Sequence, residues 1–218
     1  MVTRTRRGKQ PWVILAVAIV VAAGWLVSNH QGSEEPAAGS SVQTTASAAP
    51  AQQALEKLPV KGRAAKTGYD RDEFGPAWAD VDHNGCDTRN DVLQRDLTGA
   101  TFKPGTQACT VLTGTLHDPY TGKTIRFTRG EKTSSAVQID HSVALSDAWQ
   151  KGAQQLTATR REQLANDPLN LLAVDGPTNQ AKSDGDGATW LPPAKSYRCA
   201  YVARQIAVKT KYRGLWVT

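Results

Sequence analysis

A set of polar residues in the second half of the chain has the types and the spacing needed to hydrolyse a phosphodiester bond. Asp140 and His141 end an apolar run, Asn170 begins the next one, and Asn179 and Lys182 follow. The imidazole of His141 suits a general base, because a neutral imidazole can accept a proton from water near neutral pH. Asp140 and Asn179 offer a carboxylate and an amide oxygen, which suit a hard cation such as Mg²⁺. Lys182 could contact a phosphate oxygen as a point charge.

Each of these residues also has a plain structural explanation when it is taken alone. A histidine at the end of a strand is often a hydrogen-bonded structural residue, and Asn170 and Asn179 suit a turn and the start of a helix. Lys182 precedes the polar stretch 183–187 and is equally consistent with a solvated surface. The order and spacing of the whole set favour the catalytic interpretation.

Two strands and a helix must position these residues. Residues 137–141 and 169–174 are short, largely apolar runs, and Pro177 suits the first turn of the helix that follows. Asn179 and Lys182 are three residues apart and therefore share one face of that helix. Beside this ββα unit the pattern predicts an α+β domain with a hairpin at 111–116 and 123–129 and helices at 146–151, 159–166 and 194–212. Capping boxes at 88–91 and 159–162 would begin two helices.

Three motifs contain the polar set: Gln138-Ile139-Asp140-His141, Asn166-Asp167-Pro168-Leu169-Asn170-Leu171-Leu172 and Asn179-Gln180-Ala181-Lys182. The sequence resembles the HNH nucleases, and more closely the GmrSD-type C-terminal HNH family in its exported actinobacterial form. The resemblance extends upstream into 69–93 and downstream to 190–193. It implies a ββα-metal core in which His141 is the general base, Asp140 and Asn179 bind the metal, and Asn170 braces the hairpin that positions the base. Many HNH proteins have proline three residues after the base, where this chain has Ala144.

The formal net charge of +6 does not by itself indicate a nucleic-acid-binding surface. Residues 1–68 hold eight Lys and Arg residues against three Asp and Glu residues, which leaves a net charge of only +1 on residues 69–218. The composition, with 39% hydrophobic residues and three cysteines, excludes a polytopic membrane protein and a disulfide-dense miniprotein. The basic face of the helix at 194–212 could cradle a phosphate backbone or could simply be solvated.

The chain divides into three predicted parts. Four basic residues between positions 4 and 9 precede an uncharged apolar run at 12–27, so residues 1–27 are expected to be an export signal, either cleaved or retained as a membrane anchor. Residues 28–68 have few large apolar side chains and are expected to form a disordered linker. Residues 69–218 are then the folded domain, which would be secreted or anchored outside the cytoplasm.

The cysteines fit an oxidising compartment. Cys86 and Cys109 lie in segments typical of loops and strand edges, whereas Cys199 lies in an apolar helical stripe. We therefore expect a Cys86–Cys109 disulfide and a buried Cys199 thiol, although three cysteines allow three pairings. Closing a loop of that length would stabilise the fold by about 3 kcal/mol in the chain-entropy model.

A second pattern lies upstream of the polar set. Asp80, Asp82, Asn84 and the later Asp91 have the spacing of an EF-hand-type calcium loop. The eighth position of that loop, normally apolar, carries an aspartate here, and the segment from residue 85 also belongs to the nuclease resemblance. Arg89, in the same segment, could reach a substrate phosphate or form a surface salt bridge.

The sequence therefore predicts an exported, metal-dependent HNH endonuclease that hydrolyses phosphodiester bonds, with DNA as the expected substrate and Mg²⁺ as the expected cofactor. Its partners would be nucleic acid and, if the N-terminal segment is uncleaved, a membrane; no obligate protein partner is implied. The alternative is a non-catalytic extracellular module that binds calcium through Asp80, Asp82 and Asn84, or a polyanion through the last helix.

Overall fold

The computed structural model describes residues 49–218 and shows a mixed α+β fold with two antiparallel sheets. The first sheet consists of β1 (Leu97–Phe102), β2 (Val111–His117) and β3 (Thr124–Thr128), and the second pairs β4 (Val137–His141) with β5 (Leu171–Asp175). The expected export segment and the expected linker up to residue 48 lie outside the described residues. Between residues 49 and 218 no helix is long and apolar enough to span a bilayer.

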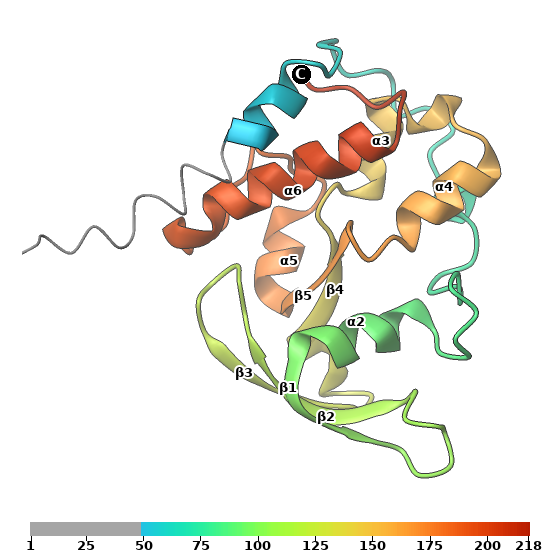
Figure 1. Ribbon diagram of the computed structural model, residues 1–218, viewed down its shortest axis with the longest axis vertical. Helices are drawn as coiled ribbons and strands as arrows, with labels where there is room; N and C mark the ends of the chain where they lie inside the picture. Colours follow the sequence, from blue (N-terminus) through green and yellow to red (C-terminus); the bar gives the residue numbers. More distant parts are fainter. Residues whose placement is uncertain (1–48) are drawn as a thin grey trace, which may run out of the picture. The chain divides into compact units, whose positions relative to one another are not determined.

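Helices and 3₁₀ turns (η) pack around the sheets (Figure 1). Helix α5 follows β5 directly and lies against both β4 and β5, so these elements have the strand, strand and helix order that the sequence predicts. The helical elements are η1 (Arg71–Phe74), α2 (Thr88–Asp96), η2 (Ser134–Ala136), α3 (Leu145–Gln150), η3 (Ala153–Gln155), α4 (Ala158–Ala165), α5 (Gly176–Lys182), η4 (Lys195–Tyr197) and α6 (Arg198–Lys211).

Strand β5 is buried on both of its faces, because alternate residues of a strand point to opposite sides. Leu171 and Ala173 pack into the core beneath α2 and the first sheet. Leu172 and Val174 pack on the other side, in a cluster with Tyr120. Truncating a buried leucine of this kind would cost about 2–5 kcal/mol. The strand that follows Asn170 is thus fixed from both sides.

Strand β1 was not predicted from the sequence. It carries a glycine at position 99, and its pairing with β2 shifts register between Thr98 and Thr101 and again between Thr101 and Phe102. An irregular edge strand of this kind shows neither strict apolar alternation nor a continuous apolar run, so its pattern carries little signal. The neighbouring hairpin of β2 and β3 was predicted correctly.

Two helices begin at other caps than the predicted ones. The side chain of Asp87, rather than that of Thr88, accepts the backbone N–H of Asn90 at the start of α2. Thr157, two residues before the predicted Thr159, caps α4. In both cases the sequence offers more than one side chain that can accept the N–H of the third helical residue, and the local pattern does not choose between them.

The segment 59–68, which we call the strap, corrects the prediction of a disordered linker for these residues. Val60 forms a bridge with Val217 near the end of the chain. The indole N–H of Trp149 donates to the carbonyl of Thr67 at 3.2 Å. The strap contributes few apolar side chains of its own, so composition suggests disorder, whereas its order comes from backbone hydrogen bonds to residues far away in the sequence.

The cysteine prediction is half correct. Cys86 and Cys109 form a disulfide, which links the start of α2 to the loop before β2. Cys199 is exposed, so the prediction that its thiol is buried is wrong. In α6 the buried stripe includes Tyr201, and a residue two positions earlier lies about 200° away around a helix, on the opposite side.

Candidate functional site

Asp140, His141 and Asn179 line one cleft, which has a volume of about 390 Å³ and which we call the polar cleft. The end of β4 and the helix α5 bring the three side chains together. A smaller cavity of about 190 Å³, the apolar cavity, is also lined by His141, together with Trp78. The polar cleft is also lined by Lys66, Tyr69, Arg71, Ser146 and Asp184, among others.

His141 is half-buried and tightly held. Its Nε2 lies 2.9 Å from the carbonyl oxygen of Ala165, and its ring stacks on that of Trp78 with 6.3 Å between the centroids and 14° between the planes. A carbonyl can only accept a hydrogen bond, so this contact assigns the proton to Nε2 and leaves the lone pair on Nδ1. Burial lowers the pKa of His141 to about 4. The hydrogen bond to Ala165 raises this pKa, whereas the positive charges of Arg71 and Lys182 lower it.

Asn170 braces the backbone that follows His141. Its Oδ1 accepts the N–H of Val143 at 2.8 Å, and its Nδ2 donates to the carbonyls of Val143 and Leu164. Its own carbonyl accepts the N–H of Ser142 at 2.7 Å. The side chain is fully buried, so it cannot meet a substrate. In this structure Asn170 therefore holds the turn after His141.

Asp140 is buried between two partners. The Nζ of Lys182 donates to its Oδ1 at 2.9 Å, and the hydroxyl of Tyr120 donates to its Oδ2 at 2.5 Å. Burial raises the pKa of Asp140, and the charge of Lys182 opposes this effect. Tyr120 reaches this position from the turn between β2 and β3, where its backbone N–H and that of Asp175 both donate to Asp118.

Lys182 does not lie where a free phosphate-binding lysine would lie. The residue is only 2% exposed, and its Nζ donates to the carbonyl of His141 at 2.9 Å as well as to Asp140. It is not among the residues that line the polar cleft. Its ammonium group thus joins α5 to the end of β4.

Asn179 and Asp140 together have the donor chemistry of a hard cation site. The Nδ2 of Asn179 donates to Oε1 of Gln138 at 3.0 Å, and within residues 49–218 its Oδ1 has no hydrogen-bond partner. Among the same residues no three His, Cys, Asp or Glu side chains gather as a metal-binding group. The set of one carboxylate and one amide oxygen fits Mg²⁺, which keeps several of its waters and needs few protein ligands.

The residues of the expected calcium loop lie outside both cavities at His141. Asp80 accepts the backbone N–H groups of Asn84 and Gly85 at 3.1 and 2.9 Å, and Asp82 accepts the side-chain amide of Asn84 at 3.1 Å. These carboxylates thus hold the loop's own backbone and side chains.

Arg89 also lies away from the polar cleft. Burial lowers its pKa, the charge of Arg129 lowers it further, and the charge of Asp87 opposes both. The structure does not bring Arg89 to the cleft of Asp140 and His141.

Three residues near the site were missed by the sequence analysis: Tyr120, Arg71 and Asp184. Tyr120 lies in a turn motif whose pattern predicts only the turn, because its contact with Asp140 spans 20 residues. Asp184 follows α5, and its Oδ2 accepts the hydroxyl of Ser146 at 3.0 Å. Arg71 belongs to the upstream motif 69–71, which the resemblance covered without giving the arginine a role.

The chain belongs to the family described as GmrSD restriction endonucleases, C-terminal domain, whose profile matches residues 87–216. It is 39% identical over 168 residues to a protein of Arthroderma benhamiae described as an uncharacterized secreted protein, a match that covers 76% of this chain and 77% of that protein. No solved structure matches the chain. The family predicted from the motifs is confirmed, and the matched region contains Asp140, His141, Asn170, Asn179 and Lys182.

Proposed function

We propose that the protein is an exported, metal-dependent endonuclease that hydrolyses phosphodiester bonds, with DNA as its substrate and β4, β5 and α5 as an HNH-type core. Membership of the GmrSD C-terminal family supports a nuclease-like function. The observation that carries the proposal is the arrangement of His141, whose Nε2 is tied to Ala165 while its ring borders a cleft shared with Asp140 and Asn179.

In this proposal His141 is the general base. The hydrogen bond to Ala165 fixes the ring, and Nδ1 takes a proton from the water that attacks phosphorus. A neutral imidazole is required for this step, and burial favours the neutral form. Asn170 keeps the turn after His141 in place, so that the base is held in one position before substrate binds.

Asp140 and Asn179 would hold the divalent cation, for which Mg²⁺ is the natural choice. When bound, the cation would supply positive charge that stabilises the phosphate oxygens and the leaving oxygen in the transition state. Lys182 orients Asp140 through the ion pair between them and through its second bond to the carbonyl of His141. This role replaces the direct phosphate contact first expected of Lys182.

Export is supported by the basic and apolar N-terminal pattern, by the Cys86–Cys109 disulfide and by the relative described as secreted. Disulfides persist outside the reducing cytoplasm, so this pairing suits an extracytoplasmic protein.

A plasmid-nicking assay with the full chain tests the proposed function. Cleavage should require Mg²⁺, stop with EDTA, and fall about 10²–10⁴-fold in His141→Ala, which is the usual contribution of a general base. His117→Ala is the matched control, because His117 is an exposed histidine that lines neither cavity at His141. Equal cleavage by the wild type and His141→Ala would exclude the base, and absence of cleavage with every divalent metal would exclude the enzyme.

A further inference from the structure

A nuclease cleft must attract a phosphodiester, which carries a negative charge. The lysine of the ββα motif does not meet this need, because Lys182 is buried and paired with Asp140. Among the residues that line the polar cleft, the basic ones besides His141 are Lys66 and Arg71. Both come from segments that precede residues 87–216, the region matched by the family.

Arg71 has the better position of the two. It lines the polar cleft and also the apolar cavity, as His141 does, so the two residues share both cavities. Its residue is exposed, and within residues 49–218 no carboxylate lies within 4.0 Å of its guanidinium.

The backbone of η1, which carries Arg71, is held in place by its neighbours, whereas the Arg71 side chain forms no ion pair among the described residues. Phe74, at the other end of η1, is buried in the core. The Nη2 of Arg161 in α4 lies 2.8 Å from a carboxylate oxygen of Glu73, and its Nε donates to the carbonyl of Glu73 at 2.7 Å. An anchored turn with a free guanidinium is preorganised for binding, because little backbone entropy remains to be lost.

Lys66 is less available than Arg71. Its Nζ lies 3.8 Å from Oδ2 of Asp184 and 5.1 Å from the centroid of the Tyr69 ring. An exposed ion pair at that distance is weak. The positive charge of Lys66 therefore still contributes to the electrostatic potential at the cleft. Lys66 therefore supplements Arg71.

We propose that Arg71 binds the substrate phosphate at the polar cleft, with Lys66 beside it as a secondary cation. A guanidinium can donate two parallel hydrogen bonds to one phosphate, which a single ammonium cannot do with the same geometry. This inference rests on the proposed function, since it names the group that would hold the substrate of that site. It also places part of the active site outside the matched family region.

The test measures cleavage and binding with the full chain. In Arg71→Ala we expect kcat/KM for duplex DNA to fall about 10- to 100-fold, as for loss of a charge-assisted phosphate contact. The slope of log Kd against log salt concentration, measured in EDTA with a labelled DNA duplex, should decrease by about 1. Arg71→Lys should restore the salt slope and only part of kcat/KM, because it keeps the charge without the paired donors.

Arg213→Ala is the matched control, because it removes one exposed arginine that lines neither cavity at His141. It should keep wild-type kcat/KM and salt slope, and both alanine variants should keep the wild-type melting temperature. Wild-type values of both quantities in Arg71→Ala would overturn the inference while leaving the nuclease intact. If neither the wild type nor any variant cleaves DNA, the proposed function fails, and the salt slope still decides whether Arg71 binds phosphate. Absence of DNA binding by the wild type would overturn both the proposed function and the inference about Arg71.

Discussion

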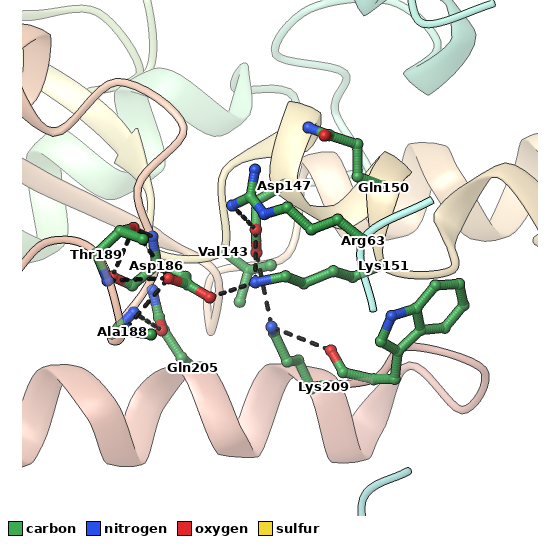
Figure 2. Close-up of polar contacts among 12 residues, drawn as sticks. Arg63, Val143, Asp147, Gln150, Lys151, Asp186, Ala188, Thr189, Gln205 and Lys209 are labelled. Atoms are coloured by element: carbon green, nitrogen blue, oxygen red, sulfur yellow. Dashed lines mark hydrogen bonds and ion pairs between the residues drawn. The ribbon is translucent and has the colours of Figure 1, made fainter. Parts of the chain in front are cut away.

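The protein contains two buried groups of acidic and basic side chains that differ in their access to solvent. The first is Asp140 with Lys182, at the edge of the polar cleft. The second, which we call the closed cluster, consists of Asp147 with Arg63, Lys151, Asp186 and Lys209 (Figure 2). None of these residues lines either cavity at His141. Both groups bury ionised side chains, so burial of an ion pair does not by itself mark a functional site. Access to the cleft beside His141 distinguishes the first group.

The closed cluster joins four segments of the chain. Asp147 in α3 lies 2.7 Å from Arg63 of the strap and 2.8 Å from Lys151, while its other oxygen lies 3.6 Å from Lys209 of α6. Lys151 also pairs with Asp186, from the loop after α5. Figure 2 shows Asp147 between the cations that converge on it. Three basic side chains thus share two carboxylates inside the protein, and one oxygen of Asp147 has no hydrogen-bond partner among the described residues.

The largest expected effect is on stability, in Asp147→Ala. Removing this carboxylate leaves Lys151 fully buried with only Asp186 as a counter-charge, and Lys209 loses its nearest acidic partner. Breaking a buried ion pair from one side typically costs about 3–5 kcal/mol, and denaturant unfolding should show a loss of that size. At temperatures where the variant is folded, its kcat should match the wild type. A loss below about 1 kcal/mol would mean that the remaining charges reach water, and the cluster would not be closed.

The corresponding change at the cleft, Lys182→Met, should separate activity from stability. Methionine fills most of the lysine volume but cannot hold Asp140 or the carbonyl of His141. Loss of a group that orients a metal ligand typically lowers activity about 10- to 100-fold, and kcat should fall by that amount. The free energy of unfolding should change less than in Asp147→Ala, because Asp140 keeps its bond to Tyr120. Partial recovery of kcat in Lys182→Arg would support an orienting role; unchanged kcat in Lys182→Met would contradict it.

The contrast between these two groups also shows what the sequence could and could not predict. That Asp140, His141 and Asn179 lie at one cleft could be predicted, because their order along two strands and a helix brings them together by local geometry. Strand β4 was predicted with its correct ends. The ion pair between Lys182 and Asp140 was not predicted, because the two residues are 42 positions apart and a local sequence pattern does not reveal contacts over such a separation. The same reason applies to Tyr120 and to every member of the closed cluster except the Asp147–Lys151 pair, whose four-residue spacing on one helix is visible in the sequence.

The smallest expected effect concerns Arg63, through which the closed cluster holds the strap. Its side chain is 35% exposed, so its pair with Asp147 is partly screened by water, and Arg63→Ala should reduce the free energy of unfolding by about 1 kcal/mol or less. The amide of Ala64, which donates to the carbonyl of Gln150 at 2.8 Å, should exchange its hydrogen faster, while amides in β5 should keep wild-type protection.

Lys57→Ala is the control for this change, because Lys57 is exposed and precedes the strap. If protection of Ala64 is the same in Arg63→Ala and the wild type, the strap is held by its backbone bonds alone. The closed cluster would then stabilise only the contacts among α3, α6 and the loop after α5. A selective loss of protection would instead show that one ion pair couples the strap to the cluster, and through the strap to Lys66 at the edge of the polar cleft.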